Sequence, residues 1–197
     1  MKNTGTLTSS QSRKIFAMLL CTAAVAGIIA GSVYGSAHSG ALPLAVHQCF
    51  LTGKSGNTAF EVMRNTFLSS AVFLLACYFS GLFALGQPIG ISLLIYRGFG
   101  IGASSAALYS AEGAGAAAKV TFLLMPGALA SVGVAVLAVR ELLRVSTGVL
   151  SLWVTGELRA EKLVDLRLYS IKFAVLLLLS LMISIGVGTL HLALSGL

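Results

Sequence analysis

The sequence is poor in charge, and it contains only six acidic residues. Charged residues make up 10% of the 197 positions, whereas 57% are hydrophobic and the mean hydropathy is +0.95. An average soluble domain carries about 25% charged residues, so this composition excludes a water-soluble fold. The apolar residues occur in blocks of about 20, which is the length that a helix needs to cross the hydrocarbon of a bilayer. The sequence therefore predicts an integral membrane protein whose apolar helices lie in lipid.

Cysteine is scarce, and a long basic run is absent. Cys21 and Cys77 lie inside apolar blocks and Cys49 lies in a polar stretch, so the sequence predicts no disulfide framework. The net charge of +7 comes from 13 Lys and Arg that lie in short stretches between apolar blocks, without interleaved aromatic residues. This placement excludes a nucleic-acid-binding surface. It favours instead a role of the basic residues in membrane orientation.

Five apolar blocks predict an all-α, polytopic membrane helix bundle that forms a single domain over residues 1–197. The expected spans are 15–34, 67–85, 89–110, 120–139 and 173–194. Between them, residues 35–60 are predicted to be a polar loop and 140–172 a charged cytoplasmic segment. The first block is longer than the apolar core of a signal peptide, which is about 7–15 residues, so it is interpreted as a span. The short connection Gly86-Gln87-Pro88 predicts that the second and third spans are antiparallel neighbours, because proline fits the first turn of a new helix.

Lys and Arg are distributed unevenly around the predicted spans. If the N-terminus is cytoplasmic, the inner side carries nine of them and the outer side three. The inner set is Lys2, Arg13, Lys14, Arg140, Arg144, Arg159, Lys162, Arg167 and Lys172, and the outer set is Lys54, Arg64 and Lys119. Cytoplasmic loops of membrane proteins carry the excess of Lys and Arg. The sequence therefore predicts a cytoplasmic N-terminus and, with five spans, a C-terminus outside.

The third predicted span combines a charge with several glycines. Arg97 is followed by Gly98, Gly100 and Gly102, which lowers the helix propensity, so a bent or re-entrant span is an open alternative. Glycines four residues apart let helix backbones approach closely, whereas a phosphate-binding loop needs a strand before it. The pattern therefore favours helix packing. The structural and packing candidates are Gly86, Pro88, Arg97, Gly98, Gly102 and Pro126.

Arg97 itself must face protein, water or headgroups, because an intramembrane charge is costly. It lies about 13 Å of helix from Pro88 at about 1.5 Å per residue. The sequence favours an Arg97 side chain that snorkels toward the cytoplasmic face or satisfies backbone carbonyls. A substrate or ion role is the alternative, although no acidic residue lies inside a predicted span to pair with Arg97.

No pattern of catalytic or metal-ligating residues can be recognised. His38, His47, Cys49 and His191 would all face the outer side, and such groups are metal ligands in proteins, but their spacing matches no ligand pattern. A serine or cysteine nucleophile needs a base that a third group orients, and no motif brings these together. The sequence is thus interpreted as non-enzymatic, without a metal or a cofactor.

The stretch 147–172 mixes leucines and Trp153 with several cations and acids. Such a composition is typical of a segment that lies along the inner headgroups, with tryptophan at the interface and cations toward anionic lipid. A cytoplasmic docking site for a partner protein is a compatible alternative.

An ordered series of motifs over residues 67–146 and in the last span resembles the stage II sporulation protein M family. The series begins with Gly86-Gln87-Pro88-Ile89, which is similar to the Gly-x-Pro close of a span in that family. The segment Leu94-Ile95-Tyr96-Arg97-Gly98-Phe99-Gly100-Ile101-Gly102 looks like its basic-Gly-Phe-x-x-Gly element. The run Phe122-Leu123-Leu124-Met125-Pro126 and the approach Leu168-Tyr169-Ser170-Ile171-Lys172 to the last span complete the likeness.

This resemblance implies a membrane scaffold of the engulfment machinery in spore-forming bacteria. It would anchor peptidoglycan-degrading proteins, namely stage II sporulation proteins D and P or similar cell-wall hydrolases, at the septum. Two alternatives stay open: a small transporter or permease subunit that uses the Gly-rich third span and Arg97, and an envelope-stress or metal-handling protein that uses the outer His and Cys residues. A homo-oligomer is also open.

Overall fold

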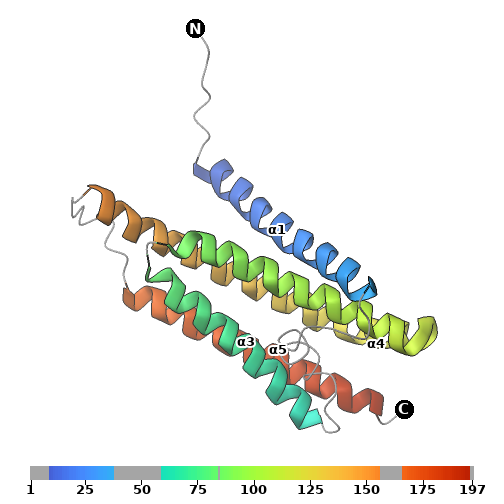
Figure 1. Ribbon diagram of the computed structural model, residues 1–197. Coiled ribbons are helices and arrows are strands. Elements are labelled where there is room, and N and C mark those ends of the chain that lie inside the picture. Colours follow the sequence, from blue (N-terminus) through green and yellow to red (C-terminus); the bar gives the residue numbers. More distant parts are fainter. Residues whose placement is uncertain (1–8, 38–58, 84, 156–165, 196–197) are drawn as a thin grey trace.

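The computed structural model describes residues 9–37, 59–83, 85–155 and 166–195. The helices in these ranges are α1 (Ser9–Ala37), α3 (Ala59–Gly81), α4 (Gly86–Thr155) and α5 (Leu166–Ser195), arranged as in Figure 1. Apart from a short turn after Gly81, the whole described backbone is helical and none of it is strand. The predicted all-helical bundle is therefore confirmed.

Within the described ranges, four helical segments are long and apolar enough to cross a membrane. They are Ala17–Ala37, Ala59–Gly81, Gly86–Ala106 and Leu166–Leu190. A helix satisfies its backbone hydrogen bonds internally, which is the condition for entering hydrocarbon. The outside of the bundle is also apolar, since Met18, Val175 and Leu178 are 70%, 59% and 62% exposed. The chain is a membrane protein, as the sequence predicts.

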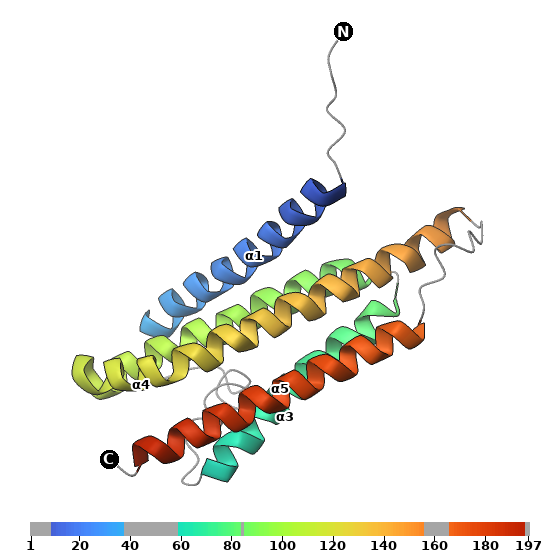
Figure 2. The same ribbon diagram turned by 180° about the vertical axis from the view of Figure 1, so that it is seen from behind.

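Helix α4 is a hairpin. Helical conformation runs through all 70 residues from Gly86 to Thr155, which would extend about 105 Å if the helix were straight. Gly90 nevertheless packs on Leu142, because a Cβ atom added at Gly90 would lie 2.8 Å from Cδ2 of Leu142. Figure 2 shows the green part of α4 beside its yellow and orange part. We call residues 86–110 the first arm and residues 126–155 the second arm.

The second arm contains most of the predicted fourth span. It returns alongside the first arm. Among the described residues, α4 contains one candidate membrane span, Gly86–Ala106, so the expected fourth span 120–139 stays a prediction. The side chains of residues 111–125 lie outside the described set. The first arm is helical over its whole length, and whether the third span crosses fully or is re-entrant stays a prediction.

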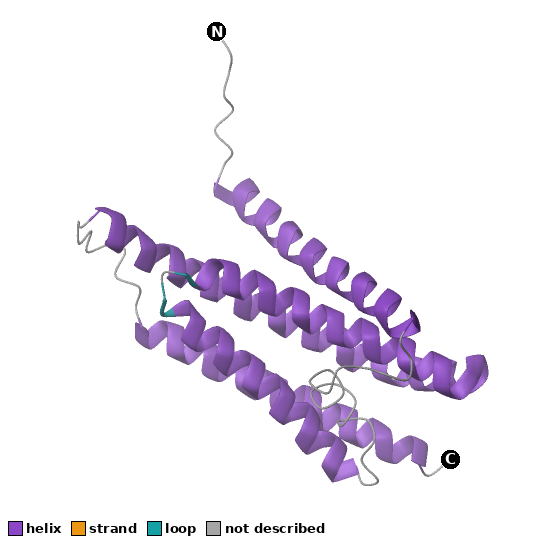
Figure 3. Ribbon diagram, in the orientation of Figure 1, coloured by secondary structure: helices purple, strands orange, loops and turns teal. Residues whose placement is uncertain are grey.

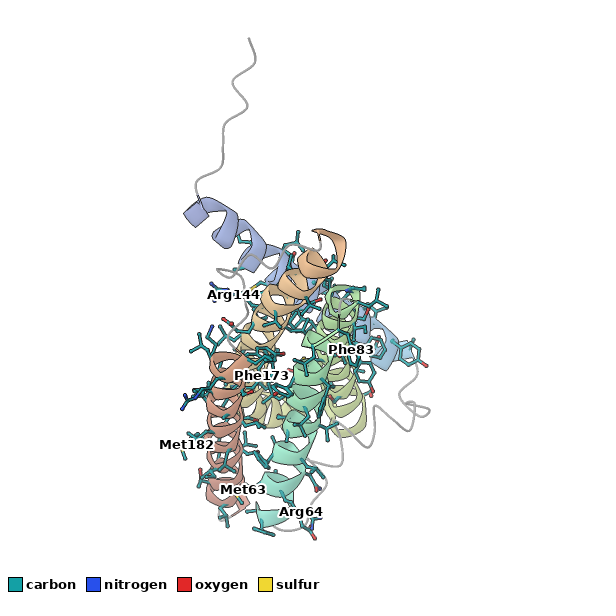
Figure 4. All side chains as sticks on the ribbon, turned by 90° about the vertical axis from the view of Figure 1, so that its left-hand side faces the viewer. Met63, Arg64, Phe83, Arg144, Phe173 and Met182 are labelled. Atoms are coloured by element: carbon teal, nitrogen blue, oxygen red, sulfur yellow. The ribbon has the colours of Figure 1, made fainter. Side chains whose placement is uncertain are left out.

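The ends of the helices gather at two ends of the bundle. One end holds the start of α1, the turn between α3 and α4, the end of α4 and the start of α5 (Figure 1). Arg144 lies toward this end, and Arg64 lies toward the other (Figure 4). Consecutive antiparallel crossings produce this grouping. The cytoplasmic placement of the N-terminus, which rests on the count of Lys and Arg, stays a prediction.

A tight turn, teal in Figure 3, connects α3 to α4. The backbone N–H of Gly86 donates to the carbonyl of Phe83 at 3.0 Å, and the Ser146 hydroxyl of the second arm donates to the same carbonyl at 3.0 Å. A Cβ atom at Gly86 would collide with the carbonyl oxygen of Ser80, so glycine is required there. Pro88 follows in the first turn, where its missing N–H has no helical partner to lose. The predicted antiparallel pairing of the second and third spans is confirmed.

Some helix boundaries differ from the predicted ones. The candidate membrane span of α3 is Ala59–Gly81 where 67–85 was predicted, and that of α5 is Leu166–Leu190 where 173–194 was predicted. The charged segment 140–172 is not separate from the helices, because α4 continues to Thr155 and residues 156–165 lie outside the described set. Arg, Glu and Leu are strong helix formers, so charge alone does not end a helix where it leaves the apolar part of the bundle.

The core joins all of these segments. Leu20 of α1, Leu74 of α3, Leu94 of the first arm and Leu142 of the second arm are each at most 1% exposed. Their burial places four side chains from four helical segments in one continuous cluster. The same cluster includes Tyr169, Phe173 and Leu176 of α5, so the packing that fixes the bundle extends over all of these helices.

Aromatic side chains hold α5 against α3. The rings of Tyr78 and Tyr169 stack with their centroids 5.1 Å apart, and the Tyr169 hydroxyl donates to the carbonyl of Tyr78 at 3.0 Å. Phe173 meets Tyr169 edge-on at 4.8 Å. Figure 4 shows Phe173 inside the bundle and Met182 pointing outward from the same helix.

Candidate functional site

Among the described side chains, Arg97 is the one charged group that is buried, with 7% of its surface exposed. It lies on the first arm of α4, about 16 Å along the helix from Gly86 at about 1.5 Å per residue. The hydrocarbon core of a bilayer is about 30 Å thick. If the first arm crosses the membrane, Arg97 lies near its middle, where a charge is most costly.

Three serine hydroxyls accept hydrogen bonds from the guanidinium of Arg97. Nη1 donates to Oγ of Ser69 at 3.0 Å, and Nη2 donates to Oγ of Ser70 at 2.9 Å and to Oγ of Ser131 at 3.1 Å. The ring of Phe73 lies 5.6 Å from Cζ of Arg97, within the range of a cation–π contact. The planar guanidinium has five donors in a fixed geometry. Arg97 thus joins the first arm to α3 and to the second arm.

The predicted snorkelling of Arg97 is wrong, because its guanidinium points into the bundle. The polar surroundings come from serines that are 27, 28 and 34 residues away in the sequence. Their small side chains leave room for the long arginine side chain between the helices. The sequence places no signal next to Arg97 that would indicate this direction.

A small cavity adjoins the guanidinium. The space open to the centre of a water-sized sphere is about 20 Å³, and about 10–15 Å³ is enough for one water molecule. Its lining residues are Thr66, Ser70, Phe73, Leu74, Arg97, Ser131, Val134, Ala135, Ser180 and Ile183. The cavity thus combines one cation and four hydroxyl-bearing side chains with an apolar wall, and it holds about one water molecule or one small ion.

The opposite side of the first arm packs against α1 through glycine. A Cβ atom at Gly98 would lie 2.5 Å from the carbonyl oxygen of Ala24, and a Cβ atom at Gly102 would collide with the backbone of Ile28. Both predicted packing glycines therefore lie where two helix backbones touch, which is the geometry that glycines at four-residue spacing allow.

Glycines of α1 complete this interface, and the sequence analysis did not identify them. A Cβ atom at Gly27 would lie 2.5 Å from the carbonyl oxygen of Ile95, one at Gly31 would collide with that of Phe99, and one at Gly35 would be 2.7 Å from that of Ala103. Their spacing of four residues is the signal that could have revealed them. Close contact between α1 and the first arm fixes the position of Arg97 on the opposite side.

The two prolines among the packing candidates are exposed rather than buried. Pro126 lies at the start of the second arm with its side chain on the surface. Pro88 borders an open, shallow groove of about 380 Å³ on the outer face of the first arm. The other residues that line the groove are Ile89, Ser92, Leu93 and Tyr96.

The residues that could bind metal or act as a nucleophile do not form a site in the described part of the chain. His38, His47 and Cys49 lie outside the described residues, as does the side chain of His191. No group of three or more metal-ligating side chains occurs among the residues that are described. Cys77 is completely buried in the core, where an apolar environment makes a thiol inert.

These features define a class: a multi-pass helical membrane protein whose described interior is a packed core around one buried cation. Compared with protein-family models, with curated proteins and with solved structures, the chain matches none.

Proposed function

We propose that the chain is a non-enzymatic membrane scaffold of the stage II sporulation protein M type, which anchors peptidoglycan-degrading proteins at the septum during engulfment. Its partners would be stage II sporulation proteins D and P or similar cell-wall hydrolases. The order of motifs from Gly86 to Pro126 and before the last span supports the family assignment. The packing of the bundle supports the scaffold class.

The filled interior is the observation that carries the proposal. The cavity beside Arg97 offers about 20 Å³ to the centre of a water-sized sphere, which is too small for an organic solute. Intramembrane polar groups are used to hold helices together: Arg97 binds three serines, and Ser184 donates to the carbonyl of Met63 at 3.1 Å. A core built in this way suits a rigid anchor.

The groove on the first arm is where a transmembrane segment of a partner would bind under this proposal. It is open, it is mostly apolar, and it lies within the membrane-crossing part of α4, between Pro88 and Tyr96. Without a hydrophobic driving force in lipid, helices associate through close packing and a few polar contacts. Ser92, which lines the groove and is small and exposed, allows close packing and offers a hydroxyl for a polar contact.

Filling the groove tests this assignment. We expect Ser92→Trp to disperse fluorescent septal peptidoglycan hydrolases in starved native cells as strongly as deletion of the chain does, because the indole fills the space that a partner helix needs. Fluorescence microscopy measures the fraction of hydrolase at the septum. Val175→Trp, on the exposed face of α5, is the matched control and should leave the septal fraction unchanged. Septal hydrolase that is unaffected by deletion contradicts the scaffold proposal.

A transporter or permease subunit is the second candidate function. The buried Arg97 beside a hydroxyl-lined cavity is the observation that favours it, since intramembrane charges often mark ion pathways. The two candidates differ in one result: Arg97→Leu would abolish solute flux while the protein still assembles in a transporter, whereas a scaffold has no flux to lose.

A further inference from the structure

The cavity beside Arg97 has a distinct polar lining whose hydrogen-bond directions can be worked out. A serine hydroxyl has one proton to donate and two lone pairs to accept with. Ser70 and Ser131 each accept from the guanidinium, so each still has its own proton to donate. Both line the cavity.

Serines in helices often donate that proton to a carbonyl one turn earlier. Ser105 does so here, with its hydroxyl 2.8 Å from the carbonyl oxygen of Ile101. Within the described part of the chain, the hydrogen bonds of Ser70 and Ser131 are those with Arg97 and none goes to such a carbonyl. Their protons are therefore available to a group in the cavity.

Ser180 adds a third hydroxyl from α5. It is 5% exposed and lines the same cavity, and no hydrogen-bond partner of its hydroxyl occurs among the described residues. A group in the cavity that accepts hydrogen bonds can therefore bind this hydroxyl as well.

Charge and size identify the kind of ligand. Arginine stays protonated in proteins, so the cavity has a fixed positive charge beside it and repels cations. The hydroxyls offer protons, which an anion accepts. The space of about 20 Å³ suits one monatomic ion and excludes a lipid phosphate or an organic acid.

We infer that Arg97, Ser70, Ser131 and Ser180 form a binding site for one small monovalent anion of the size of chloride. The anion balances the positive charge of the guanidinium inside the bundle, where burying a net charge is costly, and it accepts hydrogen bonds from α3, the second arm of α4 and α5. The bound anion thus holds these helical segments together inside the bundle. It goes beyond the scaffold function and does not depend on it, because it concerns the assembly of this chain alone.

Exchange of the anion in the buffer tests the site. The purified full chain is melted in detergent while sodium gluconate, whose anion is too large for the cavity, is replaced by sodium chloride or bromide at constant ionic strength. We expect either halide to raise the melting temperature, and in the chloride buffer we expect the protein to broaden the chloride-35 NMR line in a saturable way. Ser131→Ala and Ser180→Ala should each weaken the apparent halide affinity by about two- to tenfold, the value of one hydrogen bond.

Matched variants keep the test decisive. Ser184→Ala lies one turn beyond Ser180 on α5, and its hydroxyl binds Met63 instead of lining the cavity, so its halide response should equal that of the unmodified chain. Arg97→Met should lose the response. A melting temperature that does not respond to halide, or a response that Ser131→Ala and Ser180→Ala leave unchanged, overturns the inference.

Discussion

Removing the hydroxyls of Ser70 and Ser131 together is expected to lower the free energy of unfolding by about 3–6 kcal/mol. Interhelical hydrogen bonds between neutral groups in membranes contribute about 0.6 kcal/mol on average, whereas bonds to charged groups contribute about 1.5–3 kcal/mol each. The donor here is a buried guanidinium, so the larger range applies. Unfolding in mixed micelles, followed by helical circular dichroism, measures the loss.

The same network makes a compensation experiment possible. Adding Arg97→Met to the Ser70→Ala and Ser131→Ala variant should recover most of the lost stability, because it removes the charge that the alanines leave without these acceptors. Ser36→Ala is the control, since that hydroxyl donates to its own helix at Val33. A triple variant that is no more stable than the double one would show that the serines act through packing and not through Arg97.

Alanine at Gly102 or Gly31 is expected to destabilise the bundle by about 1–3 kcal/mol through overpacking. The added Cβ atom would meet backbone of the facing helix, at Ile28 in one case and at Phe99 in the other. Backbone cannot rotate away as a side chain can, so α1 must shift from the first arm. The same mixed-micelle unfolding measures the effect.

Gly133→Ala provides the matched control for these two variants. A Cβ atom at Gly133 would have nothing within 4 Å, and alanine in a helix interior is favoured over glycine by about 0.5–1 kcal/mol. Gly133→Ala should therefore leave stability unchanged or raise it. Equal losses at Gly102 and Gly133 would mean that the glycine contact between α1 and α4 does not hold the bundle together.

The helical fold follows from local features of the sequence, and for that reason it can be predicted. The lengths of the apolar blocks determine which segments enter the membrane. Gly86 and Pro88 mark the turn between α3 and α4, because each acts through its own backbone conformation. The predicted boundaries were less accurate at the charged end of α4 and the charged start of α5. The charged residues there favour helix, so the helices extend beyond the apolar blocks.

The surroundings of Arg97 depend on which helices pack together and in which register, and this cannot be predicted from the sequence of one helix. Ser69 and Ser70 face Arg97 only because α3 packs beside the first arm in one register. The contribution of Gly31 likewise depends on which helix lies opposite α1. A glycine spacing indicates that a helix has a flat face, but it does not identify the partner.

The scaffold function is tested most directly by affinity purification of the tagged chain in mild detergent from its native cells, sampled through starvation. Mass spectrometry identifies what is bound. The proposal predicts that a peptidoglycan-degrading protein is recovered with the chain, that its recovery rises as sporulation begins, and that Ser92→Trp removes it. Recovery of an ATPase or a solute-binding protein under all growth conditions, with no cell-wall hydrolase at any time, would contradict the proposal and favour the transporter.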